Sequence, residues 1–565
     1  MSLFATIQQS ANALQVSQLG LNVVGNNIAN ANTPGYIRQE LVQQPGAGVR
    51  IGDTILGYGV RAVGVRQKYN EFVFDQMRLA SSSLASSEKL DETYSQIEAI
   101  FSELSSSDIS SQLSEFSASI HDVLNQPGNA ALRRLVIERG RTLTSNIRTM
   151  AQRFTDIGLT IEREVQTTAS DINRLTQQIA QLNQRIVSLE GGRTSGSDAV
   201  GLRDERLKVL RELSDLVDVR AVEQPSGAVT VYAGGEYLVA DGIFREVAVS
   251  VDTSGENNQT MIHLADTDAP LIVSAGKLHG LYQARDRALG EGLDALDQFA
   301  NDLMAQFNAI HTQGQGQRGF TSVTGTNVSD DVQAPLDLAG YQTPVENGAF
   351  EIVVRDLETG QTNTHRIRVQ LSGAVDDTSL EDLRDAVSAI SGLTASILPD
   401  GEFRIESDST SIDFAFQNDT SGFLAAAGIN TFFVGSSAQT IDLNPVVADD
   451  PAMLAASLTG IGNGTDNALA LANAFDLPQA QLGDRSIKQV YEDLVVQITQ
   501  DINVQSGVSD GLRNYLRTLE SEHLAASGVN LDEEAVKMIF YQRAFQASSR
   551  LIQASSEMLD VLVNL

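Results

Sequence analysis

Histidine, cysteine and glycine-rich patterns are the parts of this sequence that could carry chemistry, and none of them completes a site. The chain contains no cysteine, which excludes thiol nucleophiles, thiolate metal sites and disulfide frameworks. No two of its six histidines lie three or four residues apart, so no helix face presents a histidine pair to a metal ion. We therefore expect an ordinary surface or core role for each of them. The histidines are His121, His263, His279, His311, His365 and His523.

The segment 314–319 matches the GxGxxG pattern of dinucleotide-binding loops. That pattern binds a pyrophosphate where it leads from a strand into a helix. Here the apolar spacing of residues 289–310 predicts a helix before the loop, so we interpret the glycines as a helix exit. The sequence has no GxSxG motif of serine hydrolases, and its paired aspartates at 376–377 and 449–450 lack the alternating ligands of a calcium loop. We expect no enzyme activity, no metal and no cofactor.

Charge is distributed unevenly along the chain. Its 565 residues include 39 Lys+Arg and 72 Asp+Glu, a net charge of −33, which argues against a general nucleic-acid binder. Residues 1–37 carry no charge at all, and the four charges of residues 539–565 sum to zero. A helix that faces water normally displays charge, so both ends are predicted to contact other protein. An uncharged start also lacks the positive region of a secretory signal peptide, and no segment has the ~18 consecutive apolar residues of a membrane span.

Both ends repeat apolar or small residues at the seven-residue spacing of a coiled coil. These residues are Ile7, Leu14, Leu21 and Ile28 near the start, and Phe540, Ala544, Ala547, Leu551, Met558 and Leu565 near the end. Helices of this kind are stabilised mainly by packing one face against a partner. We therefore expect the two ends to pair with each other and then with neighbouring molecules, and to be largely disordered without partners.

Between the ends, long helices are predicted with two β-rich insertions. Apolar residues recur about every 3.5 residues over 143–189, which predicts one rod-like helix from about residue 130 to 190. Residues 219–273 and 334–435 change to a period of two. We expect a mainly α fold with four parts. They are a terminal coiled-coil domain at 1–36 and 528–565, an extended linker with short strands at 37–83, a long-helix bundle at 84–333 and 436–527 with a β-rich segment at 219–275, and an outer β-rich (α+β) region at 334–435, as one domain or two.

The segment 26–36 places four asparagines before Pro34-Gly35. Asparagine tolerates left-handed backbone at a helix end, and Pro-Gly suits a type II turn, so the segment is either an elaborate helix cap or an uncharged hydrogen-bonding strip between closely packed copies. This run, NNIANANTPGY, resembles the N-terminal signature of the bacterial flagellar rod, hook and hook-associated proteins, and its continuation IRQ resembles the hook–filament junction branch. The segments SGVNLDEE at 527–534, FYQRAFQAS at 540–548 and TFFVG at 431–435 are similar to the same branch.

The resemblance implies a structural role without catalysis. The terminal helices would form an inner tube, the helical bundle the next shell, and the β-rich parts the outside. Copies of the protein would form a ring at the hook–filament junction, outside the cell, in contact with the hook protein and a second junction protein. The chain would leave the cell unfolded through the flagellar type III export apparatus, without a cleavable signal, and a cytoplasmic chaperone would hold its C-terminal helix before export.

The same resemblance assigns roles to residues. Subunit assembly falls to Ile7, Leu14, Leu21, Ile28, Phe540, Ala544, Ala547, Leu551, Met558 and Leu565. A turn and packing strip beside the inner tube falls to Asn27, Asn30, Thr33, Pro34, Gly35 and Tyr36. Alternatives are another axial subunit (hook, distal rod or second junction protein), a secreted coiled-coil adhesin or effector, and an enzyme in the outer β-rich region. The IRQ continuation and the long 130–190 helix disfavour the first, and unpaired His, Asp and Glu disfavour the last.

Overall fold

The computed structural model describes residues 3–33, 35–51, 54–57, 59–102, 108–191, 199–252, 259–373 and 376–563. The predictions for Pro34 and Leu565 lie outside these residues. The chain divides into two compact units, each built from segments far apart in the sequence. Unit 1 consists of Met1–Thr93, Leu159–Arg285 and Asn503–Leu565, and unit 2 of Tyr94–Gly158 and Asp286–Ile502. Three long helices contribute residues to both units: α2 (Glu71–Ser102), α4 (Ala130–Glu190) and α12 (Ile487–Ser527).

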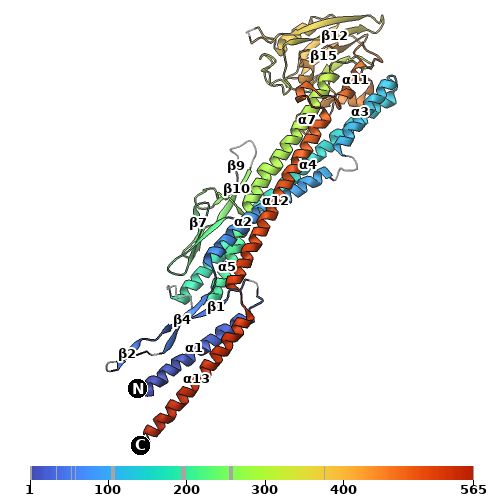
Figure 1. Ribbon diagram of the computed structural model, residues 1–565. Coiled ribbons are helices and arrows are strands. Elements are labelled where there is room, and N and C mark those ends of the chain that lie inside the picture. The colour runs from blue at the N-terminus through green and yellow to red at the C-terminus, as the bar shows by residue number, and fades with distance from the viewer. Residues whose placement is uncertain are drawn as a thin grey trace. The chain divides into compact units, whose positions relative to one another are not determined.

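The two ends of the chain meet in unit 1, where α1 (Leu3–Ala29) and α13 (Leu531–Val563) lie side by side (Figure 1). Next to α1 lie β1 (Gln39–Pro45) and β4 (Val60–Gln67), which pair antiparallel, while β2 (Gly48–Ile51) and β3 (Thr54–Gly57) form a separate hairpin between them in the sequence. The prediction that the two ends pair is confirmed.

Helix α2 begins at Glu71, inside the segment 37–83 expected to be an extended linker. The reason is local and tertiary together. The Asn70 side chain accepts hydrogen bonds from the backbone N–H groups of Phe72 and Val73, which starts the helix. Val73, Met77 and Ala80 then pack against Leu519 of α12 in one buried cluster. The extended segment therefore covers only the residues before Asn70.

The rod predicted from residue 130 to 190 is confirmed as α4, 61 residues long. Val165, Ile172, Ile179 and Ile186, spaced seven apart, are fully buried, as the 3.5-residue period requires. Around this part of α4 unit 1 places α5 (Val200–Leu216), α6 (Gly276–Gln283) and a β-rich segment. Its strands are β5 (Val219–Glu223), β6 (Val229–Ala233), β7 (Glu236–Ala240) and β8 (Ile243–Phe244) in one antiparallel sheet, with β9 (Val247–Asp252) and β10 (Gln259–Leu264) in another.

Two asparagines on α4 attach these sheets to the helix. Asn173 Nδ2 donates to the carbonyl of Val247 and its Oδ1 accepts from the Val247 N–H, both at 2.8 Å. Asn183 makes the same pair of bonds with Val229, at 2.7 and 3.0 Å. A side-chain amide thus satisfies both backbone groups of one strand residue, which places the β-rich segment 219–273 beside the rod.

Unit 2 combines helices with two three-stranded antiparallel sheets. Its helices include α3 (Ile109–Asn125), α7 (Gly290–His311), α8 (Leu380–Ser388), α9 (Phe423–Ala426), α10 (Pro445–Asp449) and α11 (Asp466–Asn473). One sheet has the order β13 (Thr362–Val369), β12 (Gly348–Asp356), β16 (Ile412–Gln417), and the other β11 (Ser322–Thr324), β15 (Phe403–Ser407), β14 (Leu393–Ile397). A short pair joins β17 (Phe433–Val434) to β18 (Asp442–Leu443). The remaining short elements are η2 (Pro451–Met453), η3 (Ala480–Leu482) and, between α6 and α7, the π-helix η1 (Ala284–Leu289).

The glycine-rich segment 314–319 leaves the end of α7, as predicted. Its glycines allow close backbone approach: a Cβ on Gly316 would lie 2.5 Å from the carbonyl oxygen of Ala452, and one on Gly314 2.6 Å from that of Ala455. The segment then leads into the bridge between Phe320 and Phe414.

No helix among the described residues is long and apolar enough to cross a membrane. The architecture is the expected one, mainly α with β-rich insertions.

Candidate assembly interface

A buried polar cluster joins the end of α1 to the start of α13. We call it the clasp and define it as Asn27, Tyr36, Arg38 and Glu534. The Glu534 side chain is fully buried and accepts hydrogen bonds from Arg38 Nε at 2.9 Å, Arg38 Nη2 at 2.7 Å and Asn27 Nδ2 at 2.9 Å. Lys537 Nζ adds a fourth contact at 3.1 Å. Arg38, the first charged residue of the sequence, thus pairs with a carboxylate 496 residues away.

Asn27 connects the clasp to the chain that follows α1. Its Oδ1 accepts from the Tyr36 hydroxyl at 2.8 Å and from the Gln39 N–H at 2.9 Å, and its Nδ2 donates to the Gln39 carbonyl at 2.9 Å as well as to Glu534. The backbone N–H of Arg38 donates to the carbonyl of Ser527 at 3.1 Å. The turn after α1 is therefore fixed against both the end of α12 and the start of α13.

The clasp holds one ionised carboxylate and one neutral phenol at neutral pH. Burial acts to raise the pKa of Glu534, but the hydrogen bonds from Asn27, Arg38 and Lys537 outweigh it and the pKa is lowered. Burial, with the nearby carboxylates of Asp204 and Glu534, raises the pKa of Tyr36 to about 12. Tyr36 can therefore serve as a permanent donor to Asn27.

Beyond the clasp, toward the two ends of the chain, α1 and α13 pack closely through small side chains. The buried residues of α1 include Ser10, Ser17 and Gly20. A Cβ on Gly20 would lie 2.6 Å from the Tyr541 ring, so only glycine lets the two helices approach this closely here. On α13 the buried and half-buried positions recur every seven residues in two rows. One row is Glu534, Tyr541, Ser548 and Ser555, and the other is Met538, Phe545, Ile552 and Leu559.

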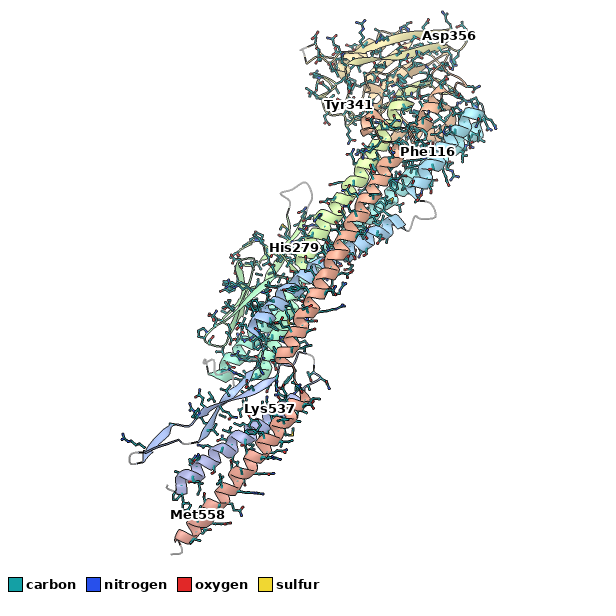
Figure 2. The ribbon with its side chains drawn as sticks, in the orientation of Figure 1. Phe116, His279, Tyr341, Asp356, Lys537 and Met558 are labelled. Atoms are coloured by element: carbon teal, nitrogen blue, oxygen red, sulfur yellow. The ribbon has the colours of Figure 1, made fainter. Side chains whose placement is uncertain are left out.

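The seam predicted for α13 lies on a different face from this intramolecular contact. Phe540, Leu551 and Met558 are 66%, 54% and 51% exposed, Ala547 is exposed and Ala544 is half-buried. Figure 2 shows Lys537 near the start of α13 and Met558 near its other end. We call the row Phe540, Ala544, Ala547, Leu551 and Met558 the outward stripe. On α1, the predicted Ile7, Leu14, Leu21 and Ile28 are all half-buried.

The predicted turn and packing strip is partly engaged inside the chain. Asn27 and Tyr36 belong to the clasp. Asn30 Nδ2 donates to the Asn26 carbonyl at 3.0 Å, and the Thr33 hydroxyl donates to Asn30 Oδ1 at 3.3 Å, as in a helix cap. Gly35 has a left-handed φ of 80°, which suits the turn. These bonds fit the helix-cap interpretation, and the interaction of the strip with other copies stays a prediction.

Several residues of this interface were not found from the sequence: Gly20, Arg38, Glu534 and Tyr541. The one available signal was that Arg38 is the first charge after a long neutral segment. Its partner could not be inferred, because nothing local marks Glu534 among the neighbouring acidic residues 532–534.

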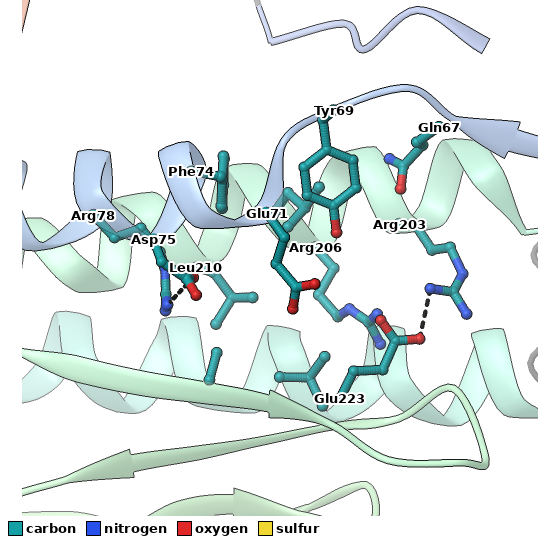
Figure 3. Close-up of a pocket in the computed structure, with 13 residues that line it drawn as sticks. Gln67, Tyr69, Glu71, Phe74, Asp75, Arg78, Arg203, Arg206, Leu210 and Glu223 are labelled. Carbon is teal, nitrogen blue, oxygen red and sulfur yellow. Dashed lines mark hydrogen bonds and ion pairs between the residues drawn. The ribbon is translucent and has the colours of Figure 1, made fainter. Parts of the chain in front are cut away.

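One small cavity in unit 1, of about 50 Å³, gathers charged groups of both signs near the start of α2. Figure 3 shows its ion pairs: Arg78 Nη2 contacts Asp75 at 2.6 Å, and Arg203 Nη1 contacts Glu223 at 2.7 Å. Arg206 instead donates to the neutral oxygens of Asn183 and Gly227, and burial lowers its pKa to about 10. The described part of the chain contains no cluster of three or more His, Asp or Glu side chains that could hold a metal ion. The terminal helices carry the residues predicted from the sequence to make contacts between copies, so they are the better candidate for a functional surface.

Comparison with known proteins places these helices in a family. The model described as the flagellar hook-associated protein FlgK helical domain matches residues 94–327. Models of the flagellar basal body rod FlgEFG protein C-terminal region and of the flagella basal body rod protein match residues 520–565 and 7–36. A relative from Salmonella typhimurium named flagellar hook-associated protein 1 is 24% identical over 99% of both chains. A relative of the same name from Bacillus subtilis is 23% identical over 100% of this chain and 98% of its own. The chain is similar along its whole length to flagellar hook-associated protein 1.

A solved structure has the same fold. The flagellar hook junction protein FlgK from Burkholderia pseudomallei is 15% identical, with a TM-score of 0.52, and the match covers 80% of this chain and all of that one. Members of the hook-associated protein 1 family are structural proteins of the bacterial flagellum, outside the cell, among other axial proteins. The two rod-protein models fall on α1 and on the α12–α13 end of the chain, which carry the clasp and the outward stripe. The helical-domain model covers residues 94–327, which include the whole of α4.

Proposed function

We propose that this protein is a structural junction subunit that connects the flagellar hook to the filament, and that its copies assemble as a ring through α1 and α13. The observation that carries the proposal is the outward stripe. The contact between α1 and α13 is already complete on one face of α13, yet a second apolar row with the same seven-residue spacing remains exposed beside it.

The composition of the stripe fits a protein partner. A face that contacted only water would carry charges, whereas the stripe residues are Phe, Ala, Leu and Met. Burying one large apolar side chain contributes about 1.5–3 kcal/mol when it leaves water completely. Phe540, Leu551 and Met558 are each about half to two-thirds exposed, so a neighbour can still gain a large part of that energy. Assembly through α1 uses the half-buried Ile7, Leu14, Leu21 and Ile28 in the same way.

The partners and the export route follow from the family. The hook protein and a second junction protein adjoin the ring, and a chaperone covers α13 before export. The chain passes through the flagellar type III apparatus without a cleavable signal and acts without catalysis. The absence of cysteine supports this route, because a chain exported unfolded cannot depend on disulfides formed beforehand. The neutral start, residues 1–37, supports burial of this end in an assembly.

A second axial role has one observation in its favour. The rod-protein models match both ends of the chain, so the terminal helices alone suit a rod or hook subunit equally well. The 61-residue α4 and the helical-domain match at 94–327 favour the junction.

The test is Leu551→Asp in cells of the source bacterium that lack the natural copy. Leu551 is largely exposed, so the change leaves the monomer folded, but an unpaired charge in a packed seam costs several kcal/mol. We expect the variant to be exported and recovered from the medium with unchanged circular dichroism, and filaments to be missing from the hooks. Ile243→Asp, on an exposed strand of unit 1, is the matched control and should leave filaments attached. Normal filaments on Leu551→Asp cells would contradict the proposal.

A further inference from the structure

A second cavity lies wholly in unit 2, and none of the residues that line it belongs to the terminal helices or to the clasp. Its volume is about 560 Å³, within the range of about 300–1,000 Å³ that ligand-binding cavities usually have. One wall is formed by residues of α7, and the other by loops around β17 and before β12. The α7 residues at the cavity include Gln298, Asn301, Asp302 and Ala305.

The wall opposite these residues is fixed by side-chain amides. Asn308 Oδ1 accepts from the backbone N–H groups of Phe432 and Phe433 at 2.9 and 3.0 Å, and its Nδ2 donates to the Phe433 carbonyl at 2.9 Å. Asn327 Nδ2 donates to the carbonyl of Ala426 at 2.8 Å. These bonds hold the loop backbone in place, so the cavity exists before a ligand arrives and little free energy is spent on ordering it.

Other polar side chains at the cavity have no hydrogen-bond partner within the described residues. They are the amides of Asn301 and Gln342 and the hydroxyl of Thr343. Asp302 accepts from Gln298 Nε2 at 2.8 Å through Oδ1, which leaves its Oδ2 for a ligand. The cavity therefore offers two amides, one hydroxyl and one carboxylate oxygen, a set that both donates and accepts hydrogen bonds.

The lining selects a class of ligand. None of the described residues that line the cavity is Lys, Arg or His, so a phosphate or another anion meets no opposite charge. Asp302 is the single carboxylate among them, too few for a dedicated divalent cation site. Met304 and Phe433 are buried and offer little surface to an apolar ligand. An uncharged molecule with many hydroxyl groups fits, because each hydroxyl is donor and acceptor at once.

We propose that this cavity binds an uncharged glycan, whose hydroxyl groups form hydrogen bonds with Asn301, Asp302 and Gln342. Flagellar hook-associated proteins lie outside the cell, where an extracellular polysaccharide can reach the cavity. The inference goes beyond the proposed function and does not depend on it, because no residue of the cavity lies on α1 or α13.

The test is saturation-transfer-difference NMR of the full chain with maltotriose and with chitotriose as the probes. We expect saturation transfer to at least one of the two sugars. Asn301→Ala and Gln342→Ala should each weaken its binding about fivefold, since each removes one hydrogen bond. Ala305→Phe, which directs a ring into the cavity from α7, should abolish binding. Asn363→Ala, at an exposed position of β13 outside the cavity, is the matched control and should bind as the unchanged chain does.

Three results would overturn the inference. The first is the absence of saturation transfer to both sugars. The second is transfer that is equal in the unchanged chain and in all the variants, which would place the sugar elsewhere. The third is transfer to the uncharged peptide trialanine in place of the sugars, lost in Asn301→Ala, which would assign the cavity to a peptide segment. Circular dichroism checks that each variant is folded. All of them should keep filaments attached, so this inference and the proposed function can fail separately.

Discussion

Glu534 is the residue on which the two ends of the chain converge, and its replacement tests the clasp directly. In Glu534→Gln the buried Arg38 retains only Glu533 as a charged partner, and that carboxylate is largely exposed. Removing one partner of a buried pair costs about 3–5 kcal/mol. We expect the exchange of the backbone N–H groups of Arg38 and Gln39, which are bonded to Ser527 and Asn27, to accelerate by at least about 100-fold in hydrogen-exchange measurements on the full chain.

The clasp should also lose stability in acid. The pKa of Glu534 is lowered in the folded chain. The stabilisation that its ionised carboxylate gives to the folded clasp is therefore complete above the ordinary glutamate pKa of 4.5, and it is lost as the pH falls through the lower folded value. Protection of the same two N–H groups should therefore fall below about pH 4.5. Glu557→Gln, at an exposed position, is the control and should change neither the exchange rates nor their pH dependence.

The close packing at Gly20 can be tested by comparing Gly20→Ala with the same change at Gly25, which lies on the same helix. Gly20→Ala directs a methyl group at the Tyr541 ring, whereas Gly25→Ala meets no atom within 4 Å. Alanine stabilises a helix interior by about 1 kcal/mol relative to glycine, so Gly25→Ala should slow exchange in α1. Gly20→Ala should accelerate exchange in both α1 and residues 541–548, and Tyr541→Ala in the same chain should relieve the clash. Equal behaviour of the two glycine variants would contradict close packing at Gly20.

At the scale of elements, α7 ends on a histidine whose burial makes unit 2 sensitive to acid. His311 is fully buried, with Nδ1 2.7 Å from the Asn430 carbonyl and Nε2 accepting from the Ala455 N–H at 3.1 Å. The neutral ring with its proton on Nδ1 satisfies both contacts. Burial is the main cause that lowers the pKa of His311 to about 4.

The lowered pKa of His311 fixes the direction in which the free energy of unfolding changes with pH. The unfolded chain protonates this histidine near pH 6.5 and the folded chain only near pH 4, so the free energy of unfolding falls as the pH drops between these values. We expect urea unfolding of unit 2, followed by circular dichroism of the full chain, to show this slope. His311→Gln should remove most of it, while His121→Gln on the exposed face of α3 should retain it. An unchanged slope in His311→Gln would contradict the assignment.

Elements with a single continuous period were predictable from the sequence. The rod α4 and the β-rich segments at 219–273 and 334–435 follow from periods of 3.5 and 2. Helix α8 begins where Ser379 and Asp382 form a capping box, a motif that is local in the sequence. The start of α2 was not predictable, because it depends on packing against Leu519 from the far end of the chain.

The faces of α13 show why the interface was only half predictable. This helix carries two sets of apolar and small residues at the same seven-residue spacing, and spacing alone does not say which set contacts α1. The choice is made by Glu534, which must reach Arg38 and Asn27 and so turns the row Tyr541, Ser548 and Ser555 toward α1. The predicted residues were thereby left as the outward stripe.

In the whole molecule, a clasp held by contacts within the chain adjoins terminal helices that depend on neighbouring copies. Residues near Asn27 and Glu534 are tied by buried hydrogen bonds, whereas the outer parts of α1 and α13, as far as the described residues show, pack mainly against each other and a short strand pair. Helices with few packing partners open easily, because most helical stability in proteins comes from packing. The terminal helices should therefore gain most of their stability on assembly.

Hydrogen exchange on the dilute full-length monomer and on hooks with attached filaments tests this claim most directly. We predict rapid exchange in residues 3–20 and 545–563 of the monomer, slow exchange in α4 and around the clasp, and strong protection of the terminal helices once assembled. A monomer whose terminal helices exchange as slowly as α4 would contradict it.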